Sequence, residues 1–238
     1  MPSAVAIGLG GAVIALGLGG ALGAAARRLS RRSGLPPGFW ALGAWPPGVL
    51  VSGLWAWLGD PLTGSLLGLL VIASAAAVAE PALDLRRPSW INLVHGGLLG
   101  VAVAPGAALL GAGAWRLWFL WDAVPSSQAL VSGWLAREGA AWWIGAAQLG
   151  LLLPFLEELL FRGHVWGLFT RVAPDRPQWA IWGTTLLFVG FHLNEPWSVA
   201  PIGLLGVCVG WLRRRSGSVW PPIACHASYN LMFVYLAS

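Results

Sequence analysis

The sequence predicts an all-α protein, a polytopic transmembrane bundle of about eight helices. Hydrophobic residues make up 57% of the 238 residues and charged residues only 10%, and the mean hydropathy is +0.71. Soluble domains carry about 25% charged residues, so this chain has too few charges to cover a surface that faces water. Apolar windows of about 20 residues, the length that crosses a bilayer, also recur along the chain.

Eight such windows predict the spans, and the seventh is the shortest of them. They cover residues 4–26, 39–59, 62–80, 91–113, 140–168, 177–195, 198–212 and 218–236. Residues 114–139 mix charges with tryptophans, and we interpret them as a connector with an interfacial helix. We therefore expect one integral membrane unit in two parts: N-terminal spans with the connector (1–139) and a core of about four spans (140–238).

The placement of arginines predicts an orientation in the membrane. Alternate connections between the predicted spans hold eleven arginines: Arg27, Arg28, Arg31, Arg32, Arg86, Arg87, Arg171, Arg176, Arg213, Arg214 and Arg215. The other connections hold only Arg116 and Arg137. The positive-inside rule therefore places both termini outside the cytoplasm.

The positive net charge of +5 does not indicate a nucleic-acid partner, because the basic residues form short clusters between apolar runs. All of them are arginine, and with abundant Ala, Gly and Trp this indicates a GC-rich bacterial genome. We therefore expect the bacterial inner membrane as the location and the lipid bilayer as a partner.

The fifth predicted span carries charges that are costly in hydrocarbon: Glu157, Glu158 and Arg162. Ionisable residues inside a span are candidates for function by default. Glu158 and Arg162 are four residues apart, the favourable order for an ion pair on one helical face. Glu157 points about 100° away from Glu158, so one carboxylate can be paired while the other faces a cavity.

Two later spans carry further polar pairs at the same spacing of four residues. The sixth contains Phe188 and His192, and the eighth contains His226 and Asn230. Each pair alone is equally consistent with packing between helices. Together, however, the last four spans concentrate ionisable and amide side chains that the first four largely lack.

These three motifs in order resemble those of the CAAX-protease and bacteriocin-processing (CPBP) family, which includes the type II CAAX prenyl endopeptidases. They are Glu157-Glu158-x-x-x-Arg162, Phe188-x-x-x-His192 and His226-x-x-x-Asn230. The resemblance covers residues from about 140 to 238, and it implies an intramembrane endopeptidase that acts on a protein or peptide substrate in or at the membrane.

The resemblance also implies roles for these residues. Glu157 is then the general base that activates water, helped by His192. His226 and Asn230 donate to the oxyanion, and Glu158, Arg162 and Phe188 support them. Amide hydrolysis needs an activated water, a proton carrier and preorganised oxyanion donors, and this set supplies all three.

Cofactor use stays open at this stage. A zinc-dependent version would use Glu157, His192 and His226 as ligands, with water in the fourth position. No His-Glu-x-x-His helix is present and the three residues come from three spans, so the version without a cofactor is favoured. Counting along antiparallel helices also places Glu157 and His192 at different depths, and they meet only if the span boundaries shift by several residues.

Substrate identity is open as well. The bacterial composition argues against prenylated tails and fits a protease of sorting tails that resembles the myxosortases. The alternative class is a non-enzymatic transporter or scaffold. Intramembrane Glu and His can form a proton relay, but the paired repeats typical of transporters are not evident.

Overall fold

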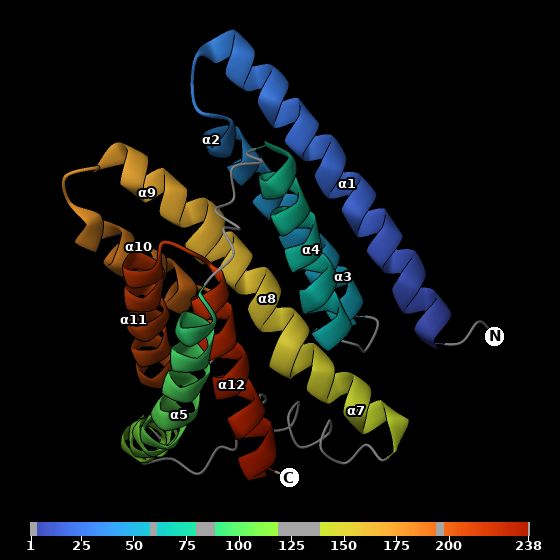
Figure 1. Cartoon of the computed structure of the whole chain (residues 1–238). Coiled ribbons are helices and arrows are strands. Elements are labelled where there is room, and N and C mark those ends of the chain that lie inside the picture. The colour runs from blue at the N-terminus through green and yellow to red at the C-terminus, as the bar shows by residue number, and fades with distance from the viewer. Residues whose placement is uncertain (1–3, 58–60, 80–88, 119–138, 194–197, 238) are drawn as a thin grey trace. The chain divides into compact units, whose positions relative to one another are not determined.

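The computed structural model describes residues 4–57, 61–79, 89–118, 139–193 and 198–237, and the regular structure of these residues is entirely helical (Figure 1). The α-helices are α1 (Ala4–Ser33), α2 (Pro37–Ala41), α3 (Trp45–Trp57), α4 (Pro61–Ala79), α5 (Trp90–Trp118), α7 (Ala140–Ala147), α8 (Leu153–Glu158), α9 (Trp166–Val172), α10 (Pro177–Gly190), α11 (Val199–Ser216) and α12 (Trp220–Ala237). A short 3-10 helix, η1 (Leu42–Ala44), precedes α3, and two π-helical stretches, η2 (Gln148–Leu152) and η3 (Leu159–Val165), flank α8.

Every predicted span contains a helix, which confirms the all-α helical membrane bundle. Among the described residues, three stretches are long and apolar enough to cross a bilayer: Gly11–Ser33, Trp90–Gly113 and Trp142–Val172. Several boundaries differ from prediction: α1, α5 and α11 continue to Ser33, Trp118 and Ser216, and α10 already ends at Gly190. The predicted interfacial helix of the connector falls largely on residues 119–138, outside the described residues.

The chain forms two compact units. Unit 1 comprises Met1–Leu83 with Gly163–Leu168, and unit 2 comprises Asp84–Arg162 with Phe169–Ser238. The division does not follow chain order, because Gly163–Leu168, a piece of the fifth predicted span, is grouped with residues 1–83. The predicted organisation into residues 1–139 and 140–238 stays a prediction.

Unit 1 is built around α4, which packs against α1 and α3. Its core uses small and branched side chains, with Ala15, Leu67 and Val71 in one cluster and Ala26, Ala41 and Ala79 in another. In a membrane, helices associate by close packing at small residues rather than by a hydrophobic driving force, and these clusters fit that rule.

Unit 2 contains the residues of the three motifs. In it α5 packs along α12 and α11, and α10 packs along α11 (Figure 1). The approach of α5 to α12 depends on glycines: a Cβ at Gly96 would meet the Pro221 carbonyl oxygen, and a Cβ at Gly100 would meet that of Cys225. Since backbone atoms of α12 occupy these positions, only glycine fits there.

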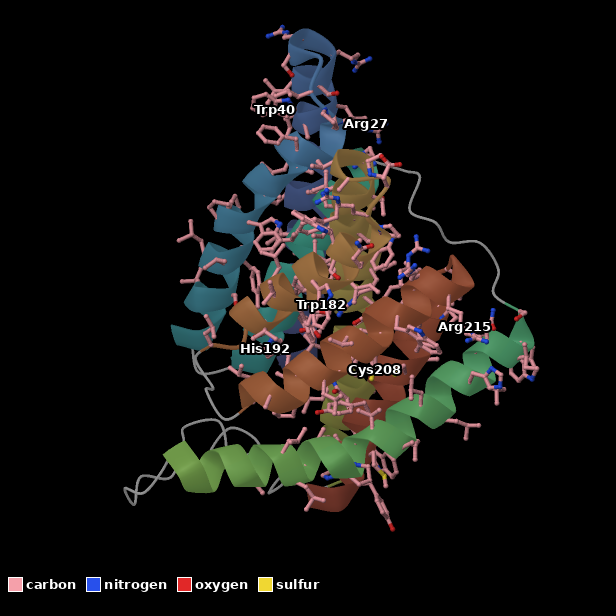
Figure 2. All side chains as sticks on the ribbon, turned by 90° about the vertical axis from the view of Figure 1, so that its left-hand side faces the viewer. Arg27, Trp40, Trp182, His192, Cys208 and Arg215 are labelled. Atoms are coloured by element: carbon pink, nitrogen blue, oxygen red, sulfur yellow. The ribbon has the colours of Figure 1, made fainter. Side chains whose placement is uncertain are left out.

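Local sequence explains how the helices of unit 2 begin and end. Pro177 stands in the first turn of α10, where a missing N–H is harmless. Gly217 ends α11 in a left-handed conformation with φ of 66°. Figure 2 shows Cys208 along α11, Arg215 near its end, and His192 just after α10.

The glycine contact between α5 and α12 predicts an effect on stability. Gly100→Ala should lower the free energy of unfolding by about 1–3 kcal/mol, because the added methyl group overpacks against the Cys225 carbonyl. Thermal unfolding of the full chain in detergent micelles measures this. Gly106→Ala is the control, since no atom lies within 4 Å of that added Cβ in the same helix. Equal unfolding midpoints for the two variants would contradict the close contact.

Candidate active site

Glu157 lies at the middle of the apolar stretch Trp142–Val172, fifteen residues from either end. It stands in α8, between the two π-helical stretches. Pro154 explains the first of these, because its ring lacks an N–H and clashes with the carbonyl four residues earlier, which widens the helix at η2. Such π-helical bulges are frequent at functional sites, and these two bracket the glutamate pair.

Glu158 and Arg162 form a fully buried ion pair, with Nη1 of Arg162 donating to Oε1 of Glu158 at 2.9 Å. Both side chains are 0% exposed. Arg162 Nη2 also donates to the carbonyl oxygen of Gly206 in α11, at 3.0 Å. Glu158 Oε2 and Arg162 Nε are buried without a hydrogen-bond partner in the described part of the chain, so the pair is not saturated.

His226 connects the two glutamates. Its Nδ1 lies 2.9 Å from Oε1 of Glu158, and its Nε2 lies 3.6 Å from Oε2 of Glu157. Because Oε1 of Glu158 already accepts a hydrogen bond from Arg162, we assign Nδ1–H of His226 as the donor to the same oxygen. This hydrogen bond fixes the ring so that Nε2 faces Glu157, which is only 8% exposed.

Phe188 brings the second histidine to the same site. Its ring lies edge-on to His192 at 4.9 Å and to His226 at 5.6 Å between centroids. The guanidinium of Arg162 lies 4.9 Å from the Phe188 centroid, a cation–π contact. One buried aromatic ring thus packs against two histidines and the arginine.

His192 lies just after the end of α10 and is partly buried. Its Nδ1 is 2.8 Å from the carbonyl oxygen of Phe188, so Nδ1–H donates and Nε2 keeps a lone pair in the neutral ring. Glu157 interacts electrostatically with both His192 and His226. Counting along the predicted spans placed Glu157 and His192 at different depths, whereas in the structure they are close enough to interact electrostatically.

Asn230 makes a different contact. Its Nδ2 donates to the carbonyl oxygen of Leu149 at 2.9 Å, and Leu149 belongs to π-helical η2. Close beside it, a Cβ at Gly150 would meet the side chain of Leu231. Asn230 therefore docks α12 on η2, and the second N–H of its amide is not used by this bond.

The structure thus gathers six of the seven predicted site residues into one network of direct contacts, and places Asn230 on η2 in the same unit. Two further participants were not predicted: Gly206, which accepts from Arg162, and Arg213, whose Nε donates to the carbonyl oxygen of Arg162 at 2.8 Å. A main-chain carbonyl carries no sequence signal, and Arg213 stands in an arginine run that was assigned to topology alone.

The structure also describes the three residues of the zinc alternative, Glu157, His192 and His226. Within the described residues, no three His, Cys, Asp or Glu side chains are grouped closely enough to hold a metal ion. Nδ1 of His226 faces Glu158 and Nδ1 of His192 faces a carbonyl oxygen, which leaves one ring nitrogen of each. A histidine that binds a metal usually donates its other ring N–H to a carboxylate or a carbonyl oxygen in the same way, so these contacts do not decide between the two versions.

Comparison with known proteins identifies the region that holds this network. Residues 139–232 match the family model described as Rce1-like, type II CAAX prenyl endopeptidase Rce1-like. The chain is also 28% identical over 83 residues to the UPF0177 protein YxdF of Lactococcus lactis subsp. lactis (strain IL1403), which covers 35% of this chain and 44% of that protein. The match therefore spans less than half the length of that relative.

No solved structure gives a significant match to this chain. The family match begins one residue before α7 and ends within α12, so it contains every residue of the network described above. Residues 139–232 are therefore similar to the type II CAAX prenyl endopeptidase Rce1-like family, which confirms the resemblance predicted from the three motifs.

Proposed function

We propose that this chain is an intramembrane endopeptidase that hydrolyses a peptide bond in a membrane-associated or C-terminal segment of a protein. The observation that carries this proposal is the position of Glu157, a buried carboxylate that faces Nε2 of His226 at 3.6 Å beside His192. The family match supports the protease class, and residues 140–238 form the catalytic core in this proposal.

In the proposed reaction Glu157 acts as the general base. The distance of 3.6 Å between Glu157 Oε2 and His226 Nε2 allows one water to lie within hydrogen-bond reach of both atoms. Glu157 takes a proton from this water, and the resulting hydroxide attacks the scissile carbonyl carbon. When the C–N bond of the peptide breaks, Glu157 passes this proton to the leaving amine. Nε2 of His192 is a second acceptor for a hydrogen bond from the water. General catalysis of this kind contributes about 10²–10⁴-fold.

His226 and Asn230 are the proposed donors to the oxyanion of the tetrahedral intermediate. The hydrogen bond from Nδ1–H of His226 to Glu158 has a consequence for this role. In the neutral ring, Nε2 is then an acceptor, so His226 donates to an oxyanion only as the imidazolium. Glu157 and Glu158 lie on its two sides. Asn230 contributes the N–H that its bond to Leu149 leaves unused.

The proposed setting is the inner membrane of a bacterium, with lipid and a protein or peptide substrate as the partners. The substrate is a C-terminal or membrane-associated tail, either a prenylated one or a bacterial sorting tail, and the composition favours the sorting tail. The family name mentions prenylated tails, so both kinds of probe are needed.

Replacing Glu157 with Gln should reduce peptide hydrolysis by at least about a hundredfold, since the isosteric amide cannot take a proton. The full chain in liposomes is incubated in ¹⁸O-water with a farnesylated Cys-containing peptide and with an unlipidated peptide that ends in an apolar helix. Mass spectrometry then detects ¹⁸O in a new carboxyl group.

The matched control for this experiment is Asp175→Asn, which removes an exposed carboxylate in the turn between α9 and α10. It should leave the rate unchanged. Full cleavage by the Glu157→Gln protein would rule out this glutamate as base, and a phenotype in cells without any cleavage would favour the scaffold alternative.

The proposal also predicts the response to metal removal. Because the residues of the network do not group as metal ligands, purification in the presence of 1,10-phenanthroline should leave the rate of peptide cleavage unchanged. Metal content is measured on the same sample by inductively coupled plasma mass spectrometry. Stoichiometric zinc, together with loss of cleavage that added zinc restores, would instead establish the zinc-dependent version.

Both termini are proposed to lie outside the cytoplasm. Alkaline phosphatase is active only outside the cytoplasm, so a fusion after Ser238 should be active. An insertion at Asp175, in the turn that carries Arg171 and Arg176, should be inactive. The reverse pattern would overturn the orientation.

A further inference from the structure

Helix α11 holds Arg162 through two hydrogen bonds that run in opposite directions. Nε of Arg213 donates to the main-chain carbonyl oxygen of Arg162 at 2.8 Å, and Nη2 of Arg162 donates to the carbonyl oxygen of Gly206 at 3.0 Å. Gly206 and Arg213 are seven residues apart and share one face of α11. The helix therefore fixes both the backbone and the side chain of Arg162.

Arg213 differs from the two arginines that follow it. It is only 7% exposed, whereas Arg214 and Arg215 are exposed. A guanidinium is costly to bury unless it is hydrogen-bonded, and an arginine that only marks the cytoplasmic end of a span can extend its charge to the interface instead. The burial of Arg213 therefore requires a reason inside the protein.

The hydrogen bond from Arg213 to Arg162 is one such reason. Arg162 lies in π-helical η3, where the regular i→i+4 ladder of main-chain hydrogen bonds is interrupted. Arg213 binds the carbonyl oxygen at this point. From Arg162 a continuous series of contacts runs through Glu158 Oε1 to Nδ1 of His226, both at 2.9 Å. A change in the Arg162 backbone is therefore transmitted to the ring of His226.

We propose that Arg213 is a positioning residue for the Glu158–His226 pair and that it acts through Arg162. The proposal rests on the proposed function and assigns no contact between Arg213 and substrate. The atom that matters is Nε, which donates the hydrogen bond, rather than the charge of the guanidinium. Loss of this donor should lower kcat and leave KM unchanged, because substrate binding is not altered.

Three substitutions separate the donor from the charge. In Arg213→Gln the amide Nε2 takes the place of the arginine Nε with no charge. In Arg213→Lys the charge stays, but the ammonium lies one atom further along the side chain, and in Arg213→Met both are lost. We expect Gln to keep kcat close to the wild-type value, and Lys and Met to lose about tenfold to a hundredfold, as small misplacements of catalytic groups do.

The same three substitutions at exposed Arg214 are the matched controls, and they should leave kcat unchanged. The activity assay uses the two peptides named above in liposomes. If Lys keeps kcat and Gln loses it, the charge is what matters and the proposal is wrong. It is also wrong if the Arg213 and Arg214 series behave alike.

A measurement without substrate tests the connection to His226 directly. The chain has four histidines, so ¹³Cε1-labelled histidine gives four NMR signals, each assigned by a single substitution. The signal of His226 should move in Arg213→Met and stay in place in Arg214→Met. An unmoved signal overturns the connection. If neither peptide is cleaved by the wild type but the signal moves, the proposed function fails while the connection stands.

Discussion

The structure of the site depends on the buried ion pair between Glu158 and Arg162. An ion pair in an apolar interior repays its desolvation only when its geometry is good and further hydrogen bonds satisfy the remaining donors and acceptors. Here Glu158 Oε1 accepts from Arg162 and from His226, and Arg162 donates onward to Gly206. Each of these partners comes from a different helix, so the requirement to satisfy one pair fixes α8, α11 and α12 together.

This constraint separates the roles of two adjacent glutamates. Glu158 is fully buried, and its Oε1 is bound by both Arg162 and His226. Oε2 of Glu157 lies 3.6 Å from Nε2 of His226, which is too far for a hydrogen bond. In the proposed function, this is where the water binds. The hydrogen bond of His226 to Glu158 also determines which ring nitrogen faces Glu157. Residues that bond the second ring nitrogen of a metal-binding histidine orient the ring in the same way.

Much of this was predictable from the sequence. Windows of apolar residues located a helix for every span, and charges at spacings of four residues identified the Glu158–Arg162 pair and the members of the network. The rest depends on tertiary contacts that leave no pattern. The end of α10 at Gly190 lies inside an apolar run, the acceptors for Arg162, Arg213 and Asn230 are main-chain carbonyl oxygens, and the clustering of Gly163–Leu168 with unit 1 follows packing.

Two of the three main-chain acceptors lie in π-helical stretches. A helical carbonyl oxygen has a second lone pair, so a side chain of a neighbouring helix can bind it even in a regular helix, as Arg162 binds Gly206 in α11. Leu149 and Arg162 both lie in π-helical stretches and receive Asn230 and Arg213 respectively. The two interruptions flank Glu157 and Glu158. Irregular backbone on both sides of Glu157 and Glu158 therefore provides two of the points at which α11 and α12 bind the helix that carries them.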